Sequence, residues 1–310
     1  MPQAFGTRRP AGPSGEVAPE GAARILETGY RPYDGERLGP SHATWTLTRH
    51  TFQRILGLRR PARYKILPVL SVLIAYLPAI AFIGATALLP GARVRTAVPD
   101  PSAYFGFVTA ALVLFATLAA PEALCPDKRS KFLGICLASP LTRTTYLIAK
   151  VGAVATAMLI VTLGPPLLLL TGEALQNDGP RGFGGFMQTL SQCVFAGLAL
   201  AVMFTALALV APSLTDRRAF ASAGGILLVI GSAAVSNIMA FGLQLGDGWL
   251  LLGLDRLPFE VTARIFDRHG PPTPSGTPLP TFAVAGVAIA VTVVAAGITW
   301  WRVVGSEVTR

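Results

Sequence analysis

Apolar residues along the chain gather in six long blocks that are separated by more polar segments. The blocks cover residues 67–89, 104–120, 151–171, 189–211, 219–242 and 281–301. A helix needs roughly 20 apolar residues to cross about 30 Å of hydrocarbon, and none of the six blocks contains Asp, Glu, Lys, Arg or His. The pattern therefore predicts an all-α membrane protein whose six transmembrane helices form one domain over residues 67–302.

The overall composition agrees with this pattern. Charged residues make up 14% of the chain, whereas soluble proteins average about 25%. Residues 1–27 are rich in Ala, Gly, Pro and Arg and contain no apolar stretch of the kind that a signal peptide requires. We therefore expect residues 1–27 to be a disordered N-terminal segment, with the first span serving as the insertion signal.

The distribution of Lys and Arg predicts the orientation in the membrane. If the chain crosses six times, 20 of the 26 basic residues fall on the side that holds both termini. Because basic residues accumulate on the cytoplasmic side, both termini, including a tail over residues 303–310, are expected in the cytoplasm. The net charge of +10 then follows from topology and needs no nucleic-acid partner. Abundant Arg, Ala, Gly and Pro are typical of a GC-rich genome, which favours a bacterial inner (plasma) membrane.

Two regions outside the spans have amphipathic patterns. In the cytoplasmic segment 28–66, residues 45–60 predict a basic helix that lies in the headgroup plane as an elbow before the first span. Its apolar face would carry Trp45, Phe52, Ile55 and Leu56. A solvated linker helix is the alternative. On the other side, residues 249–266 predict one or two interfacial helices within the exposed connection 243–280, and residues 270–280 predict a loop.

Several classes of function lack the residues that they need. Ion-coupled transporters, pumps and intramembrane proteases usually place ionisable groups within their spans, and this chain has none there. None of its four lysines follows a glycine, so no phosphate-binding Gly-Lys motif occurs. The cysteines at 125, 136 and 193 do not have metal-binding spacing. We therefore expect no catalytic residue, metal or cofactor in this chain, and any transport would need energy from a partner.

The connection after the second block carries a recognisable motif. Residues 121–133 read Pro-Glu-Ala-Leu-Cys-Pro-Asp-Lys-Arg-Ser-Lys-Phe-Leu, and Pro140, Leu141, Thr142, Arg143, Tyr146 and Lys150 follow. This region resembles the signature region of ABC-2 type permeases, the membrane subunits of one class of ATP-binding-cassette exporter. Residues 29–37 also resemble a cytoplasmic stretch of some members. One departure is Lys131, where the family often has Gly.

The resemblance implies a six-span exporter permease that pairs with a second permease copy or a homologous permease. Membrane lipid surrounds it, and a separate ATPase subunit binds ATP and Mg. Residues 121–133 would form a coupling helix on the cytoplasmic surface that fits a groove of the ATPase. In that helix Pro121 and Glu122 suit the first turn. Apolar contacts would come from Leu124, Phe132 and Leu133, and directional charge pairs from Asp127, Lys128 and Arg129. The alternative is a solvated turn whose charges only satisfy the topology rule.

Spans two and five would contribute most to contact with the second permease. Two other classes of function remain open: a membrane scaffold or assembly factor without transport, and an intramembrane enzyme or secondary transporter. An ATPase gene beside this one would favour the exporter, whereas charge-free spans argue against the enzyme and the secondary transporter.

Overall fold

A computed structural model describes the chain over residues 38–58, 61, 64–88, 99–130, 132, 134, 141–176, 179–180 and 182–305. These residues form helices and connecting segments, with no strand among them. All the helices belong to the unit Leu38–Arg310. The expectations for residues 1–27, for residues 306–310 of the tail, and for Lys131, Leu133 and Pro140 lie outside the described residues.

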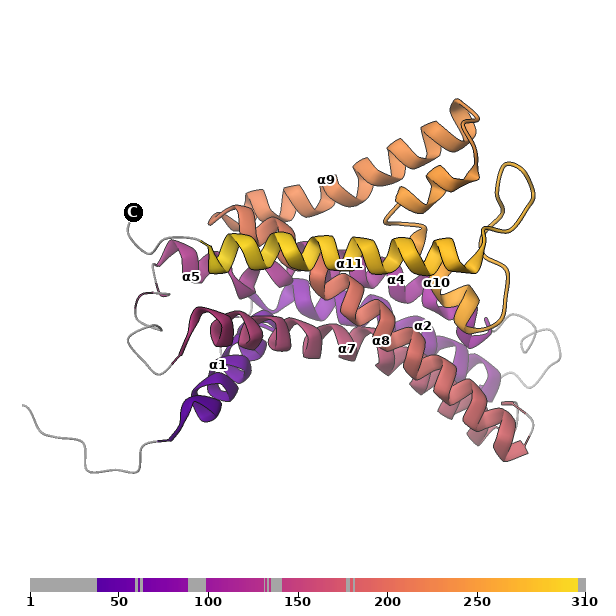
Figure 1. Cartoon of the computed structure of the whole chain (residues 1–310). Helices are drawn as coiled ribbons and strands as arrows, with labels where there is room; N and C mark the ends of the chain where they lie inside the picture. The colour runs from indigo at the N-terminus through magenta and orange to yellow at the C-terminus, as the bar shows by residue number, and fades with distance from the viewer. Residues whose placement is uncertain are drawn as a thin grey trace, which may run out of the picture. The chain divides into compact units, whose positions relative to one another are not determined.

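Six helices are long and apolar enough to cross a membrane, as the sequence predicted (Figure 1). They are α2 (Ile66–Leu88), α4 (Pro101–Leu118), α7 (Arg143–Leu175), α8 (Gly182–Leu214), α9 (Arg218–Asn237) and α11 (Thr281–Val304). A π-helical turn, η3 (Ile238–Gly242), extends α9. The chain is therefore a multi-pass membrane protein.

Two of these helices extend far beyond their apolar blocks. Helices α7 and α8 have 33 residues each, and α8 begins at Gly182, before the block 189–211. Gly172 follows the block 151–171, but α7 continues through it to Leu175. Gly172 is buried, and a Cβ there would lie 2.5 Å from Cδ1 of Ile83 in α2. Close packing thus offsets the cost of about 1 kcal/mol that glycine imposes inside a helix.

Burial differs greatly among the spans. We compare the most apolar stretch of 18 residues in each span. In the spans that begin with α4 and α8, 61% of this stretch is buried, but in α9 and α11 only 11% is buried. Large apolar side chains such as Leu227 and Ile230 of α9 are exposed, as expected of a surface in contact with lipid. Because α4 is mostly buried within the chain, it offers less surface for a second permease than the expectation for span two requires. Helix α9 retains such a surface.

The amphipathic helix before the first span is α1 (Pro40–Ile55), which begins five residues earlier than predicted. Pro40 occupies its first turn, where a missing N–H costs nothing. Gly57 follows its end with a φ of 68°, and a Cβ there would lie 2.6 Å from the carbonyl oxygen of Tyr64. Helix α1 packs against α7. Ile55 is buried and Phe52 and Leu56 are half-buried, but Trp45 is 65% exposed, so the predicted common face does not describe this contact.

The connection between α9 and α11 contains two short helices, η4 (Asp247–Leu252) and α10 (Leu257–Ile265). Helix α10 packs against α4, α8 and α11. It buries Leu257, Pro258 and Glu260, which is more burial than the predicted interfacial helix required. This part of the chain lies at the start of α4, where Arg268 pairs with Asp100 at 2.7 Å. The segment that follows α4 lies at the other end of the bundle (Figure 1).

Candidate functional site

The segment after α4 consists of two short helical turns rather than the single predicted helix. A 3-10 turn, η2 (Ala120–Ala123), is followed by α5 (Cys125–Arg129), and Leu124 lies between them. Pro121 and Pro126 each occupy a first turn. Proline favours a helix start and disfavours the helical conformation of the residue before it. The two prolines therefore divide the segment.

Asp127 of α5 is the centre of a buried polar network. Its side chain is 2% exposed, and its Oδ2 lies 2.6 Å from Nζ of Lys150 in α7, which is 1% exposed. Arg54 of α1 reaches Oδ1 at 2.6 Å. The hydroxyl of Tyr146 donates to Oδ2 at 2.9 Å, and Nζ of Lys150 donates to Thr51 Oγ1 at 2.9 Å. One carboxylate thus joins α5 to both α1 and α7.

The same segment is tied to α8 and α9. Glu122 of η2 is buried, and its Oε1 lies 2.5 Å from Nη1 of Arg218, the first residue of α9. Nζ of Lys128 donates to the carbonyl of Ser213 in the last turn of α8. The thiol of Cys125 donates to the carbonyl of Thr215 at 3.7 Å. The turns η2 and α5 therefore hold contacts with four other helices.

These contacts change the roles expected for the segment. Pro121, Glu122, Leu124 and Asp127 are buried within the chain, so they do not form an exposed docking face. Lys128 is half-buried. Arg129 is exposed and Phe132 is 37% exposed. Within the described residues, Arg129 and Phe132 are thus the predicted contacts that can reach a partner.

The downstream motif residues contribute to the same end of the bundle. Thr142 caps α7 through a reciprocal pair of hydrogen bonds with Thr145, which satisfies donors that a helix start leaves free. Nη1 of Arg143 donates to the carbonyl of Val304 at the end of α11, at 2.8 Å. Leu141 is buried. The structure therefore brings Tyr146 and Lys150 together with Asp127, and places Arg143 against α11.

Three partners in the network were not identified from the sequence as site residues: Thr51, Arg54 and Arg218. Their partners lie 69 or more positions away along the chain, or in a different connection. A sequence signal existed for Lys150, because Tyr146, Lys150, Ala153 and Ala157 recur at helical spacing and all are buried. A lysine on such a face must be paired, and that predicts a buried acidic partner.

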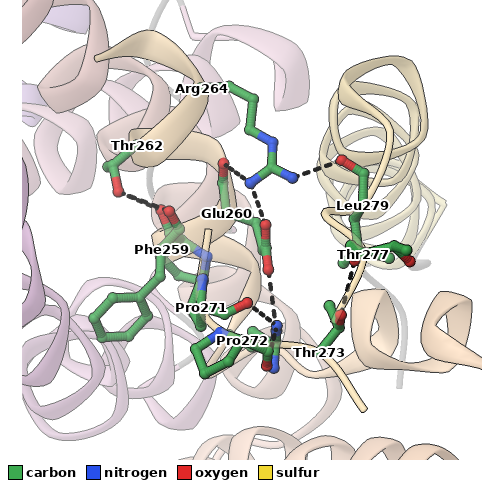
Figure 2. A network of polar contacts seen from close by, with 11 residues as sticks. Phe259, Glu260, Thr262, Arg264, Pro271, Pro272, Thr273, Thr277 and Leu279 are labelled. Carbon is green, nitrogen blue, oxygen red and sulfur yellow. Dashed lines mark hydrogen bonds and ion pairs between the residues drawn. The ribbon is translucent and has the colours of Figure 1, made fainter. Parts of the chain in front are cut away.

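A second polar network lies at the α10 end of the bundle. Glu260 is 1% exposed and is held by Arg256, at 3.1 Å, and by Arg264. Figure 2 shows how Arg264 also donates to the carbonyl of Leu279, at 2.7 Å. Arg256 donates to the carbonyls of Pro271 and Pro272. The spacing Arg-x-x-x-Glu-x-x-x-Arg puts all three side chains on one helix face, and the network fastens residues 271–279 to α10.

A cavity of about 510 Å³ opens at this same end. Phe82, Leu169 and Phe266 contribute apolar walls, and Asp100 and Arg268 form an exposed ion pair at its edge. No cluster of three His, Cys, Asp or Glu residues able to hold a metal ion occurs in the part of the chain that the structure describes.

Comparison with protein-family models finds none that matches the chain, and comparison with curated proteins finds no match either.

Proposed function

We propose that the chain is the permease subunit of an ABC-2 type exporter, with η2 and α5 as the element that receives force from a separate ATPase. The observation that carries this proposal is the set of contacts around η2 and α5. Asp127 is bound to α1 and α7, and Glu122 is bound to α9. A displacement of this short segment must move those helices or break buried ion pairs, and breaking such a pair costs about 3–5 kcal/mol.

The position of the segment supports the same function. It follows α4 directly, lies at one end of six apolar helices, and presents Arg129 and Phe132 on its exposed side. The chain itself has no Gly-Lys phosphate-binding motif, which fits a subunit that takes energy from a partner ATPase. In this proposal both termini and η2–α5 face the cytoplasm of a bacterial cell, in line with the distribution of basic residues.

Cysteine labelling tests this orientation. The three native cysteines are replaced by alanine, and Ser275→Cys or Ser41→Cys is introduced, since both serines are exposed and lie at opposite ends of the bundle. An impermeant maleimide should label the Ser275→Cys variant in intact cells, but the Ser41→Cys variant only after lysis. The reverse pattern would mean that η2–α5 faces outward, and the coupling role would be lost.

Co-expression with a candidate ABC ATPase subunit from the same genome, followed by co-purification, tests the function. Arg129→Glu and Phe132→Ala should each reduce the ATPase recovered with the permease by severalfold, without lowering the melting temperature, because both side chains are exposed. Arg49→Glu on α1 is the matched control, since Arg49 is an exposed arginine at the same end of the bundle. Equal recovery from all variants would place the docking face elsewhere.

A non-transporting scaffold is the second candidate, because the exposed face of α9 could bind another membrane protein. The two functions differ in one measurement. The purified permease–ATPase complex should hydrolyse ATP faster in the presence of an exported amphiphile. A stable complex whose hydrolysis is indifferent to any amphiphile would favour the scaffold.

A further inference from the structure

The groove between the starts of α2 and α9 has the two-part lining that a phospholipid requires. One cavity, of about 980 Å³, is lined by Arg129, Arg217 and Arg218, with Asp216 and Glu122. A second, of about 400 Å³, is lined by apolar residues that include Leu67, Pro68 and Leu118. Tyr64, Glu122 and Arg218 line both cavities, so the two adjoin. We call this pair of cavities the α2–α9 groove.

The polar part of the groove lies at the level of lipid headgroups. Arg218 is the first residue of a 25-residue span, and Tyr64 lies two residues before another span. Span ends lie where the hydrocarbon meets the headgroup layer. The apolar part includes Leu67 of α2, which is 37% exposed. On α9, Phe220 follows Arg218 by two residues and is 62% exposed. A headgroup in the polar part would thus leave its acyl chains in contact with apolar side chains.

The charges in the groove select the kind of headgroup. Among the described residues, three arginines and two carboxylates line the polar part, and Glu122 is already paired with Arg218. Arg217 is exposed, and its guanidinium lies 5.8 Å from the centre of the Phe220 ring. Guanidinium groups bind phosphate oxygens through paired hydrogen bonds. The excess of positive charge therefore favours a headgroup whose phosphate is not balanced by an amine.

We propose that the α2–α9 groove binds an anionic phospholipid, with Arg217 and Arg218 at its phosphate and Leu67 and Leu118 beside its acyl chain. A lipid bound there would share the Arg218 guanidinium with Glu122 of η2, so its phosphate would contact the residue that already joins η2 to α9. The proposal rests on the membrane-spanning fold and does not depend on the ATPase partner or on transport.

Lipid binding to the purified, delipidated full chain in detergent tests the proposal. Native mass spectrometry measures the retention of phosphatidylglycerol and of phosphatidylcholine by the wild type. Arg217→Gln should weaken phosphatidylglycerol binding about fivefold, because each basic group near an anionic lipid contributes about that factor. Arg217→Gln with Arg218→Gln should weaken it further. Arg302→Gln, an exposed arginine at the end of α11, is the matched control and should bind as the wild type does.

Three results would overturn the proposal. The first is equal retention of phosphatidylcholine and phosphatidylglycerol by the wild type, which would mean that apolar contact alone holds the lipid. The second is unchanged phosphatidylglycerol binding by Arg217→Gln, a variant that leaves the Glu122–Arg218 pair intact. The third is stabilisation of the wild type by soluble glycerol 3-phosphate as strong as that by phosphatidylglycerol, which would indicate an anion site without a lipid. None of these measurements involves ATP. A result that refutes lipid binding therefore leaves the co-purification test of the exporter unaffected.

Discussion

Removing the charge of Asp127 should strongly destabilise the bundle. Asp127→Asn keeps the side-chain volume but takes away the carboxylate that pairs with Lys150, whose side chain is 1% exposed. It also turns an amide N–H₂ toward Lys150 or Arg54, which are both donors. Two unit charges about 4 Å apart interact by about 4 kcal/mol at an effective dielectric constant of 20. The measured cost of breaking a buried pair is about 3–5 kcal/mol, so both estimates agree.

The partners of Asp127 predict a ranking among variants. Lys150→Met should cost less than Asp127→Asn, because Asp127 keeps Arg54 and the Tyr146 hydroxyl. The variant with both Asp127→Asn and Lys150→Met should recover much of the stability that Asp127→Asn loses, since it removes both buried charges. Arg54, at 22% exposed, can then be hydrated. Asp216→Asn is the control, because Asp216 is an exposed carboxylate at the same end and such groups contribute little.

Thermal unfolding of the purified chain, followed by tryptophan fluorescence, measures this ranking. A loss of 3–5 kcal/mol should lower the midpoint by about 10 °C. Half-lives at one fixed temperature should give the same order when unfolding is irreversible. The reasoning fails if Asp127→Asn and Asp216→Asn have the same melting midpoint. It also fails if the variant with both Asp127→Asn and Lys150→Met is less stable than Asp127→Asn alone. Either result would mean that the pair does not stabilise the folded chain.

Two further changes probe packing and the α10 network. Gly172→Ala should lower the free energy of unfolding by about 1–3 kcal/mol, because its Cβ would lie 2.5 Å from Cδ1 and 2.6 Å from Cγ1 of the β-branched Ile83. Gly286→Ala, with open space around it, should be neutral or slightly stabilising. Equal melting midpoints for the two variants would mean that α2 shifts freely. Glu260→Gln should free residues 271–279 and speed their cleavage by proteinase K, because Arg256 and Arg264 then lose the carboxylate that orients them. Asp267→Asn is the control, since Asp267 is exposed with a φ of 54° that asparagine also adopts, and cleavage as fast in this variant would contradict the role of Glu260.

The six spans could be predicted from the sequence because their signal is local. Each apolar block needs only its own length and lack of charge to be recognised. The ends were less predictable, because glycine often ends a helix. Pro165 and Pro166 lie within α7, as they do within the third predicted block, and neighbouring helices can satisfy the backbone groups that proline leaves unpaired. Gly172 likewise stays helical because Ile83 packs against it.

The candidate site was less predictable, because its contacts join segments far apart in the chain. The motif identified Asp127, Tyr146 and Lys150 as a group, but nothing local showed that they meet. Arg54 lies within the predicted basic helix 45–60, and its contact with Asp127 spans 73 positions. Glu122 was expected on the cytoplasmic surface, in the first turn of the coupling helix that the family resemblance implies. Only the arrival of Arg218 from the start of α9 explains its burial.

The order in which the network residues are synthesised sets a constraint on membrane insertion. Arg54 leaves the ribosome 73 residues before Asp127, and Thr51 leaves 99 residues before Lys150. At synthesis rates of about 5–20 residues per second, the first interval alone lasts roughly 4 to 15 seconds. During that time Arg54 lacks its carboxylate partner and Thr51 lacks its hydrogen-bond donor, so α1 must stay at the membrane surface, where its exposed Trp45 can lie among lipid headgroups. Lys150 then arrives with the third span, so the burial of its ammonium depends on an Asp127–Arg54 pair that is already within reach.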